Sequence, residues 1–273
     1  MRDITNIKIV EEQRLAKKCC GLNNISLCKK SDNCSCKAAA EILAYLKTII
    51  PSPYYKYSIH DFTGSHGKDQ LLEKDVASKA KRQIIDFCWE GIDALKVVDT
   101  SISELEKYSC ISKRREIGNN IVIFDNSSLS QKNKQNPKGK TMCASLIMKE
   151  AIKSREYVDC IPRNEKLCHT YEWVEYPILE NMIMNNNDVN DVRVSDLKSV
   201  DWLVIDDITF FEKKESWKRR MVDFFFLERL EEKLPTILVL KFDIIKNCTE
   251  DILGVGLSKI IRDDKTFFIS LTS

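Results

Sequence analysis

Hydrophobic spacing predicts that the first part of the chain is helical. Residues 38–50 carry the pattern of an amphipathic helix, and Pro51 and Pro53 end it because proline cannot continue a helix. Helical spacing returns from Leu71 to about Tyr108, where one face gathers a set of apolar positions: Ile84, Ile85, Cys88, Trp89, Ile92 and Leu95.

The pattern changes at Asn120, where short apolar runs begin to alternate with helical segments. Five runs predict strands, at residues 121–124, 157–161, 202–205, 236–240 and 267–271. Segments between them predict helices, at residues 141–153, 177–184, 216–232 and 250–262. Such alternation is typical of an α/β protein whose parallel sheet is covered by helices on both faces.

A Gly-Lys-Thr sequence lies between the first predicted strand and the helix that follows it. A phosphate-binding loop has the form G-x-x-x-x-G-K-[ST], and here Lys134 stands at the first glycine position. Backbone N–H groups at the helix start would face phosphates, Lys140 would reach the β- and γ-phosphates, and Thr141 would bind Mg²⁺. We predict a nucleotide site formed by Lys138, Gly139, Lys140, Thr141 and Met142. The alternative is a solvated loop rich in Asn, Ser and Lys.

A second motif strengthens this interpretation. The apolar strand in VDWLVIDDI, residues 200–208, ends in two aspartates. Asp206 would help to hold Mg²⁺, and Asp207 would orient or deprotonate the attacking water. Adjacent carboxylates at the end of a buried strand are costly unless a cation or solvent offsets them. An ordinary exit from a strand remains the alternative for this motif alone.

From about Ile121 to its end, the chain resembles the AAA+ domain of bacterial replicative-helicase loaders of the DnaI/DnaC type and of the related IstB-like transposition helpers. The resemblance rests on IDDI, a helix with a tryptophan and arginines, LERLEEKLPTILVLKFD, and SKIIRDD before a terminal strand. IPSPYYKYSIHDF, residues 50–62, is similar to the segment that precedes the ATPase domain in these loaders. The resemblance covers about two-thirds of the chain.

The resemblance implies a P-loop NTPase fold of the AAA+ (ASCE) class and an ATP-switched helicase loader. Such a protein binds ATP and Mg²⁺, delivers a hexameric replicative helicase to single-stranded DNA, and assembles through AAA+ interfaces. It also implies a catalytic role for Asp207, a first-sensor position at Lys241 and a second sensor at Arg262. A transposase-helper ATPase and a degenerate, non-hydrolysing adaptor are the alternatives. Arg219, Arg220 and Arg229 are candidates for an arginine finger, with a surface arginine as the simpler interpretation of each.

Three residues depart from the family pattern. Lys134 and Pro137 stand where the family has glycines, which limits close approach of the backbone to a phosphate. Lys241 stands where the first sensor is usually Asn, and a lysine cannot accept a hydrogen bond from water. We therefore predict weak or slow hydrolysis, as in a switch rather than a motor.

Five of the eleven cysteines cluster near the amino terminus, at Cys19, Cys20, Cys28, Cys34 and Cys36. A structural zinc takes four thiolate or imidazole ligands. We predict a Zn²⁺ site of Cys28, Cys34 and Cys36 with Cys20 or Cys19, and His60 as a substitute ligand. The alternative is a set of reduced thiols packed under a short helix. We interpret the six dispersed cysteines as apolar filling.

Charge and hydropathy narrow the remaining function classes. With 43 basic and 41 acidic side chains, the net charge is +2, so contact with nucleic acid must be local. Candidate contacts for weak binding of single-stranded DNA are Lys132, Lys134, Lys138 and residues 213–220. No apolar run reaches the roughly 20 residues of a membrane span, and the start lacks a signal-peptide core, so we expect a cytoplasmic protein. We divide the chain into a cysteine-rich amino-terminal domain (1–50), a linker (51–70) and an AAA+ domain without a carboxyl-terminal lid (71–273).

Overall fold

The structure is a computed structural model, and it describes most of the predicted α/β part. The candidate zinc ligands Cys20, Cys28, Cys34 and Cys36, the loop residue Lys138 and the predicted strand at 157–161 lie outside the described residues. Described are residues 44–57, 59–62, 65–66, 69–70, 74–89, 109–125, 139–152, 170–185, 192–209, 216–241 and 250–272.

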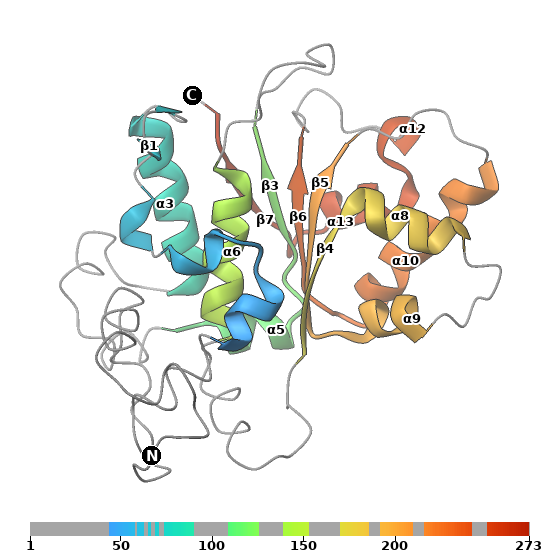
Figure 1. Cartoon of the computed structure of the whole chain (residues 1–273). Coiled ribbons are helices and arrows are strands. Elements are labelled where there is room, and N and C mark those ends of the chain that lie inside the picture. Colours follow the sequence, from blue (N-terminus) through green and yellow to red (C-terminus); the bar gives the residue numbers. More distant parts are fainter. Residues whose placement is uncertain are drawn as a thin grey trace, which may run out of the picture.

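A five-stranded parallel sheet forms the centre of the molecule (Figure 1). Its strand order is β4-β5-β6-β3-β7, so β6 lies between β3 and β5. The predicted strands at residues 121–124, 202–205, 236–240 and 267–271 are confirmed, whereas β4 was not predicted. The strands are β3 (Ile121–Phe124), β4 (Tyr171–Glu175), β5 (Trp202–Ile208), β6 (Thr236–Leu240) and β7 (Phe267–Ser270).

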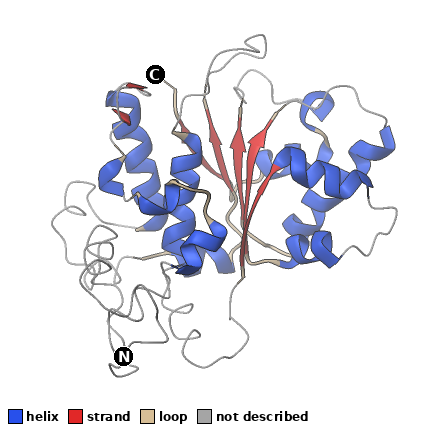
Figure 2. Cartoon of the chain, in the orientation of Figure 1, coloured by secondary structure: helices blue, strands red, loops and turns tan. Residues whose placement is uncertain are grey.

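Helices cover both faces of this sheet, as the alternating pattern predicts (Figure 2). One layer contains α3 (Lys74–Cys88), α5 (Ile111–Glu116) and α6 (Lys140–Ile152). The other contains α8 (Tyr176–Asn185), α9 (Val192–Ser199), α10 (Ser216–Glu231), α12 (Glu250–Leu253) and α13 (Val255–Arg262). Shorter elements are η2 (Tyr54–Lys56), η3 (Ile59–Asp61), β1 (Ser65–His66) and β2 (Asp69–Gln70).

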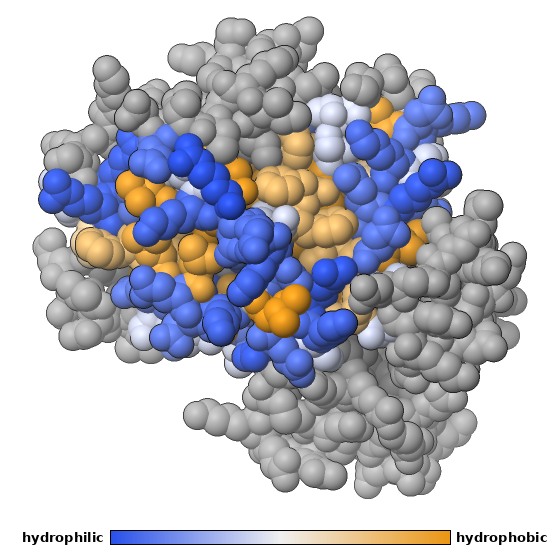
Figure 3. Space-filling model, turned by 180° about the vertical axis from the view of Figure 1, so that it is seen from behind, coloured by the Kyte–Doolittle hydropathy of each residue, from blue (hydrophilic) through white to orange (hydrophobic). Residues whose placement is uncertain are grey.

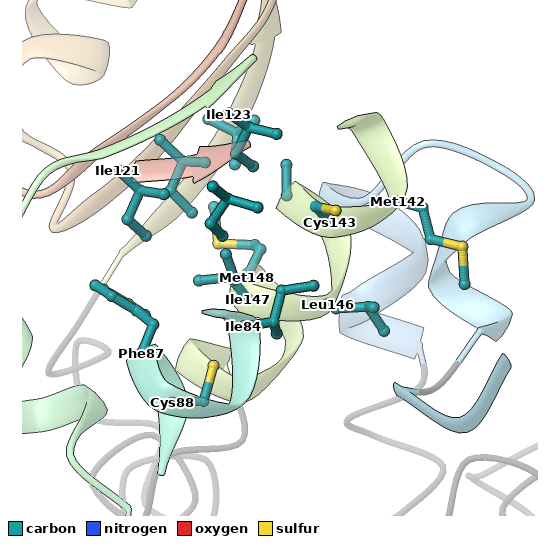
Figure 4. Close-up of a cluster of buried hydrophobic side chains, with 14 of the residues drawn as sticks. Ile84, Phe87, Cys88, Ile121, Ile123, Met142, Cys143, Leu146, Ile147 and Met148 are labelled. Carbon is teal, nitrogen blue, oxygen red and sulfur yellow. The ribbon is translucent and has the colours of Figure 1, made fainter. Parts of the chain in front are cut away.

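The strands contribute alternate side chains to two hydrophobic cores. In β3, Ile121 and Ile123 pack with α3 and α6, whereas Val122 and Phe124 pack with α8, α10 and α13. Successive side chains of a strand point to opposite faces, so a strand buried on both faces is apolar along nearly its whole length. The continuous run IVIF meets this requirement. Figure 4 shows part of the first core, where Phe87 of α3 and Met148 of α6 lie on the side facing Ile121 and Ile123.

The prediction of one helix over residues 250–262 is wrong, because Gly254 interrupts it. Gly254 has φ of 82°, and a Cβ at this position would lie 2.5 Å from Oδ1 of Asp223 on α10. The same carboxylate oxygen accepts a hydrogen bond of 2.8 Å from the backbone N–H of Gly256. The side chain of Asp223 therefore takes up a backbone donor at the start of α13 and ties this helix to α10.

Residues 44–62 pack against the first helical layer. Residues 44–49 are helical, and Leu46, Ile50 and Phe62 are buried in the same core as α6. The buried ammonium of Lys149 on α6 donates a hydrogen bond to the main-chain oxygen of Tyr57. The predicted domain boundary at residue 50 stays a prediction, because residues 1–43 lie outside the described part of the chain.

Among the described residues, none of the helices combines the length and the apolar character that a membrane span requires.

Candidate functional site

Charged residues meet where three neighbouring strands end. Asp125 directly follows β3, Lys241 directly follows β6, and Asp206 and Asp207 lie near the end of β5. Because β6 lies between β3 and β5 and all strands run in parallel, these ends share the carboxyl edge of the sheet. Open α/β sheets bind their ligands at this edge.

Lys140 is the first residue of α6 and is almost completely buried, with 3% of its surface exposed. Its ammonium forms an ion pair with Oδ2 of the fully buried Asp125. Burial lowers the pKa of Lys140, and the carboxylate of Asp125 opposes this shift by favouring the charged form. A buried ammonium requires such a partner because removal of its hydration is costly.

Asp206 is linked to the start of the same helix. Its carboxylate accepts hydrogen bonds from the hydroxyl of Thr141 and from the backbone N–H of Asp207, the latter at 2.8 Å. Burial nevertheless raises the pKa of Asp206 to about 6, and these hydrogen bonds oppose the rise. The two predicted Mg²⁺ ligands, Thr141 and Asp206, therefore lie in direct contact.

Asp207 departs from regular strand geometry. Its φ is 64°, in the left-handed region that aspartate adopts more readily than most residues, and it falls within a register irregularity between Ile205 and Ile208. Bulges of this kind re-aim side chains and are over-represented next to active sites. The half-exposed carboxylate of Asp207 forms an ion pair of 2.6 Å with the ammonium of Lys241.

This donor set fits a phosphate group with a bound Mg²⁺. The ammonium of Lys140 can contact phosphate oxygens, and the hydroxyl of Thr141 and carboxylate of Asp206 are the oxygen ligands that Mg²⁺ takes. Within the described residues, no group of three or more His, Cys, Asp or Glu side chains could hold a metal ion. An Mg²⁺ ion at Thr141 and Asp206 would therefore need phosphate and water to complete its coordination.

Comparisons with known proteins bear on the fold of the chain. The sequence matches no protein-family model and no curated protein. Among solved structures, it is similar to the DnaC helicase loader, with 13% identity over 81% of this chain and 99% of that chain and a TM-score of 0.50. The chain has a DnaC-like fold. The predicted α/β fold class, a parallel sheet covered by helices on both faces, is thereby confirmed. Residues 1–43 of the predicted cysteine-rich amino-terminal domain lie outside the described residues.

The chain is less similar to two further solved structures. A DnaI structure shares 17% identity over 70% of this chain and 91% of that chain, with a TM-score of 0.40. A proposed primosome component from Streptococcus pyogenes serotype M3 shares 11% identity over 83% of this chain and 94% of that chain, with a TM-score of 0.47.

The remaining predicted site residues occupy different surroundings. Gly139 accepts a backbone hydrogen bond of 2.9 Å from Cys143, so it joins the first turn of α6. The side chain of Met142 is fully buried and points away from β3 (Figure 4), which leaves its main chain for contact with a phosphate. Arg262, the predicted second sensor, donates to Oε1 of Glu250 on α12 at 3.3 Å, with both side chains more than half exposed.

Arg229 is not a surface arginine, which corrects our interpretation of it. Its guanidinium is fully buried beneath α10, so it cannot reach a neighbouring subunit as an arginine finger. All three of its nitrogens donate hydrogen bonds of 2.9–3.1 Å. The acceptors are the hydroxyl of Thr236 and the main-chain oxygens of Leu197, Lys198, Val200 and Pro235. Arg229 therefore holds α10 to β6 and to the segment before β5.

Asp125 is the site residue that sequence reasoning missed. Its only sequence signal is an acidic residue directly after the apolar run IVIF. That signal is weak, because polar residues commonly follow strands, and the pairing of Asp125 with Lys140 depends on the fold.

Proposed function

We propose that this protein is an ATP-switched helicase loader that binds ATP with Mg²⁺ and delivers a hexameric replicative helicase to single-stranded DNA. The observation that carries the proposal is the cluster of Lys140, Thr141 and Asp206 where α6 begins beside the end of β5. A solved structure with which the chain shares its fold is that of a helicase loader.

Each residue of the cluster has a role in this proposal. The ammonium of Lys140 would bind phosphate oxygens, and Thr141 and Asp206 would hold Mg²⁺. The metal would neutralise phosphate charge when bound. Asp207 would orient a water molecule or accept its proton.

Nucleotide binding, rather than fast hydrolysis, is the switch in this proposal. The carboxylate of Asp207 is already paired with the ammonium of Lys241 at 2.6 Å, so this ion pair must rearrange before Asp207 can orient a water molecule. Lys134 and Pro137 also stand where relatives have glycines. Slow turnover would keep the ATP-bound form populated for long enough to act on a partner.

We extend the proposal to the partners and metals that the resemblance implies. Residues 1–50 would bind the helicase, with Zn²⁺ held by Cys20, Cys28, Cys34 and Cys36. The ATP-bound domains would assemble and contact single-stranded DNA weakly. One zinc per chain in freshly reduced protein, measured by elemental analysis, would support this extension, and absence of zinc would contradict it.

Co-sedimentation with a purified hexameric replicative helicase tests the loader function. The full chain is mixed with helicase and single-stranded DNA in ATP–Mg²⁺, in ADP–Mg²⁺ and without nucleotide. Lys140→Met removes the proposed phosphate ligand. Lys149→Met is a matched control, because Lys149 is also a buried lysine of α6 but contacts the main chain of Tyr57.

We expect ATP to promote transfer of helicase to DNA with the wild type and with Lys149→Met, but not with Lys140→Met. Absence of helicase binding in every nucleotide state would contradict the loader function. Stimulation of a transposase instead would favour the transposase-helper alternative.

A non-hydrolysing adaptor is the second candidate function. Both site lysines are paired with carboxylates of the same site, Lys140 with Asp125 and Lys241 with Asp207. An adaptor that has lost its nucleotide would be stabilised by such internal neutralisation. It would bind the helicase equally well in all three nucleotide states.

A further inference from the structure

The ion pair between Asp125 and Lys140 joins the end of β3 to the start of α6 inside the protein. Exposure is 0% for Asp125 and 3% for Lys140. Solvent therefore screens this pair much less than a surface pair. The pair brings the buried negative charge of Asp125 into contact with Lys140, the lysine to which we assign phosphate binding.

A phosphate group and Asp125 would compete for the same ammonium. Lys140 has three N–H donors on one nitrogen, and at least one of them points to Asp125. A phosphate placed within reach of Lys140 would also lie near the carboxylate of Asp125, and like charges repel strongly where water is excluded. Binding must therefore overcome the existing ion pair.

Two other charged groups, Asp206 and Lys241, act on Lys140, but neither takes the place of Asp125 as its ion-pair partner. Asp206 also favours the charged lysine, but its carboxylate accepts hydrogen bonds from Thr141 and Asp207. Lys241 disfavours the charged lysine and is itself paired with Asp207. Asp125 is thus the principal counter-ion of Lys140.

We propose that Asp125 is a positioning residue that sets the nucleotide affinity and selectivity of this site. Its carboxylate holds the ammonium of Lys140 until an anion of sufficient charge takes the place of that carboxylate. This inference rests on the proposed nucleotide function. It assigns the ligand class as nucleoside triphosphates in preference to diphosphates. A γ-phosphate brings additional negative charge toward Lys140, whereas a diphosphate offers less to offset the loss of the Asp125 partner.

Calorimetric titration of the full chain with ATP–Mg²⁺ and ADP–Mg²⁺ tests the proposal. Asp125→Asn keeps the size of the side chain and removes its charge, whereas Asp125→Glu keeps the charge and serves as the control. We expect Asp125→Asn to bind ATP about tenfold more tightly than the wild type, because the phosphate no longer has to displace a charged partner from Lys140. We also expect the ratio of ATP to ADP affinity to fall. Asp125→Glu should retain the wild-type preference.

A second comparison separates this role from a merely structural one. In the Lys140→Met background, Asp125→Asn should not restore ATP binding, because the ammonium for which the anions compete is gone. Equal or weaker ATP binding by folded Asp125→Asn, with binding intact in the wild type, would overturn the role of Asp125 and leave the proposed function standing. Absence of ATP binding in both the wild type and Asp125→Asn would overturn both.

The wild-type chain provides a test if Asp125→Asn does not fold. The carboxyl ¹³C resonance of Asp125 can be assigned with the charge-free pair Asp125→Asn/Lys140→Met. We expect this resonance to shift on saturation with ATP–Mg²⁺ and to shift less with ADP–Mg²⁺. A resonance that stays unchanged with ATP while calorimetry shows binding would overturn the proposal.

Discussion

Arg229 and Lys140 are both buried cations, yet they differ in what satisfies them. The guanidinium of Arg229 donates to five neutral oxygens of the chain, so its hydrogen bonds belong to the fold. The ammonium of Lys140 has a carboxylate partner at the edge of the sheet, where a phosphate anion can replace it. The first residue stabilises the fold, and the second is suited to binding.

Substitution of Arg229 by methionine should strongly destabilise the protein. The change leaves several buried oxygens without donors, and each such group costs about 1–3 kcal/mol. We expect the free energy of unfolding to fall by about 3 kcal/mol or more in chemical denaturation. The control is Arg220→Met on the same helix, where the arginine is exposed and the expected change is small. Equal stability of the two variants would contradict the structural role of Arg229.

Substitution of Lys241 by asparagine should raise the rate of ATP hydrolysis. The change removes the ammonium that pairs with Asp207 at 2.6 Å and supplies a side chain that can both donate and accept hydrogen bonds. Steady-state phosphate release by this variant should exceed that of the wild type and of the exposed-lysine control Lys259→Asn. A lower rate would show instead that Lys241 assists the reaction.

The raised pKa of Asp206 predicts a pH dependence of stability. The folded protein holds this proton up to about pH 6, whereas an ordinary carboxyl releases it near pH 3.8. Between these values the folded state binds more protons than the unfolded state, so the contribution of Asp206 to the free energy of unfolding falls as the pH rises. Denaturation without nucleotide or metal should show the wild type losing stability relative to Asp206→Asn across this window. Parallel pH profiles would rule out the raised pKa.

At the scale of elements, the strongest sequence patterns predicted the structure best. The run at 121–124 is apolar throughout, and the run at 236–240 is apolar after Thr236. They match β3 and β6, because strands buried on both faces form nearly continuous apolar runs. β4 lies at the edge of the sheet and was missed because its sequence, YEWVE, contains two glutamates and forms no continuous apolar run. The break at Gly254 was missed because it depends on Asp223, which lies on another helix.

Replacement of Gly256 by alanine should test the contact between α10 and α13. A Cβ at this position would lie 2.5 Å from the main-chain oxygen of Asp223, which cannot move without displacing α10. We expect the free energy of unfolding to fall by about 1–3 kcal/mol, as for other overpacked sites. Val255→Ala, at the exposed neighbouring position, is the control and should change stability little. A stable Gly256→Ala variant would show that the two helices can separate at low cost.

Part of the candidate site could be predicted because its motifs are local in the sequence. Gly-Lys-Thr and the paired aspartates are recognisable because each lies within a few residues of chain. Asp125 and Arg229 escaped prediction because their partners lie 15 and up to 32 residues away, and sequence spacing does not reveal which charges are buried together. The strand order, which brings Lys241 between the other charged ends, also depends on long-range pairing.

At the scale of the whole molecule, α6 connects the candidate site with residues 44–62. Its first residue, Lys140, contacts Asp125 at the edge of the sheet, and Lys149 further along contacts the main chain of Tyr57.

The opposite view of the molecule shows hydrophobic side chains at the surface among hydrophilic ones (Figure 3). The large hydrophobic side chains exposed among the described residues are Ile117, Ile178, Trp217, Phe224 and Val255.

The most direct test of a live nucleotide site is calorimetric titration of ATP–Mg²⁺ into three proteins: the wild type, Lys140→Met and Lys149→Met. All three are first checked for folding by circular dichroism. We predict binding by the wild type and by Lys149→Met, at one ATP per chain, and none by Lys140→Met. Equal affinity in Lys140→Met would contradict the assigned role of Lys140. Absence of binding in all three folded proteins would contradict the account and leave the non-hydrolysing adaptor as the better description.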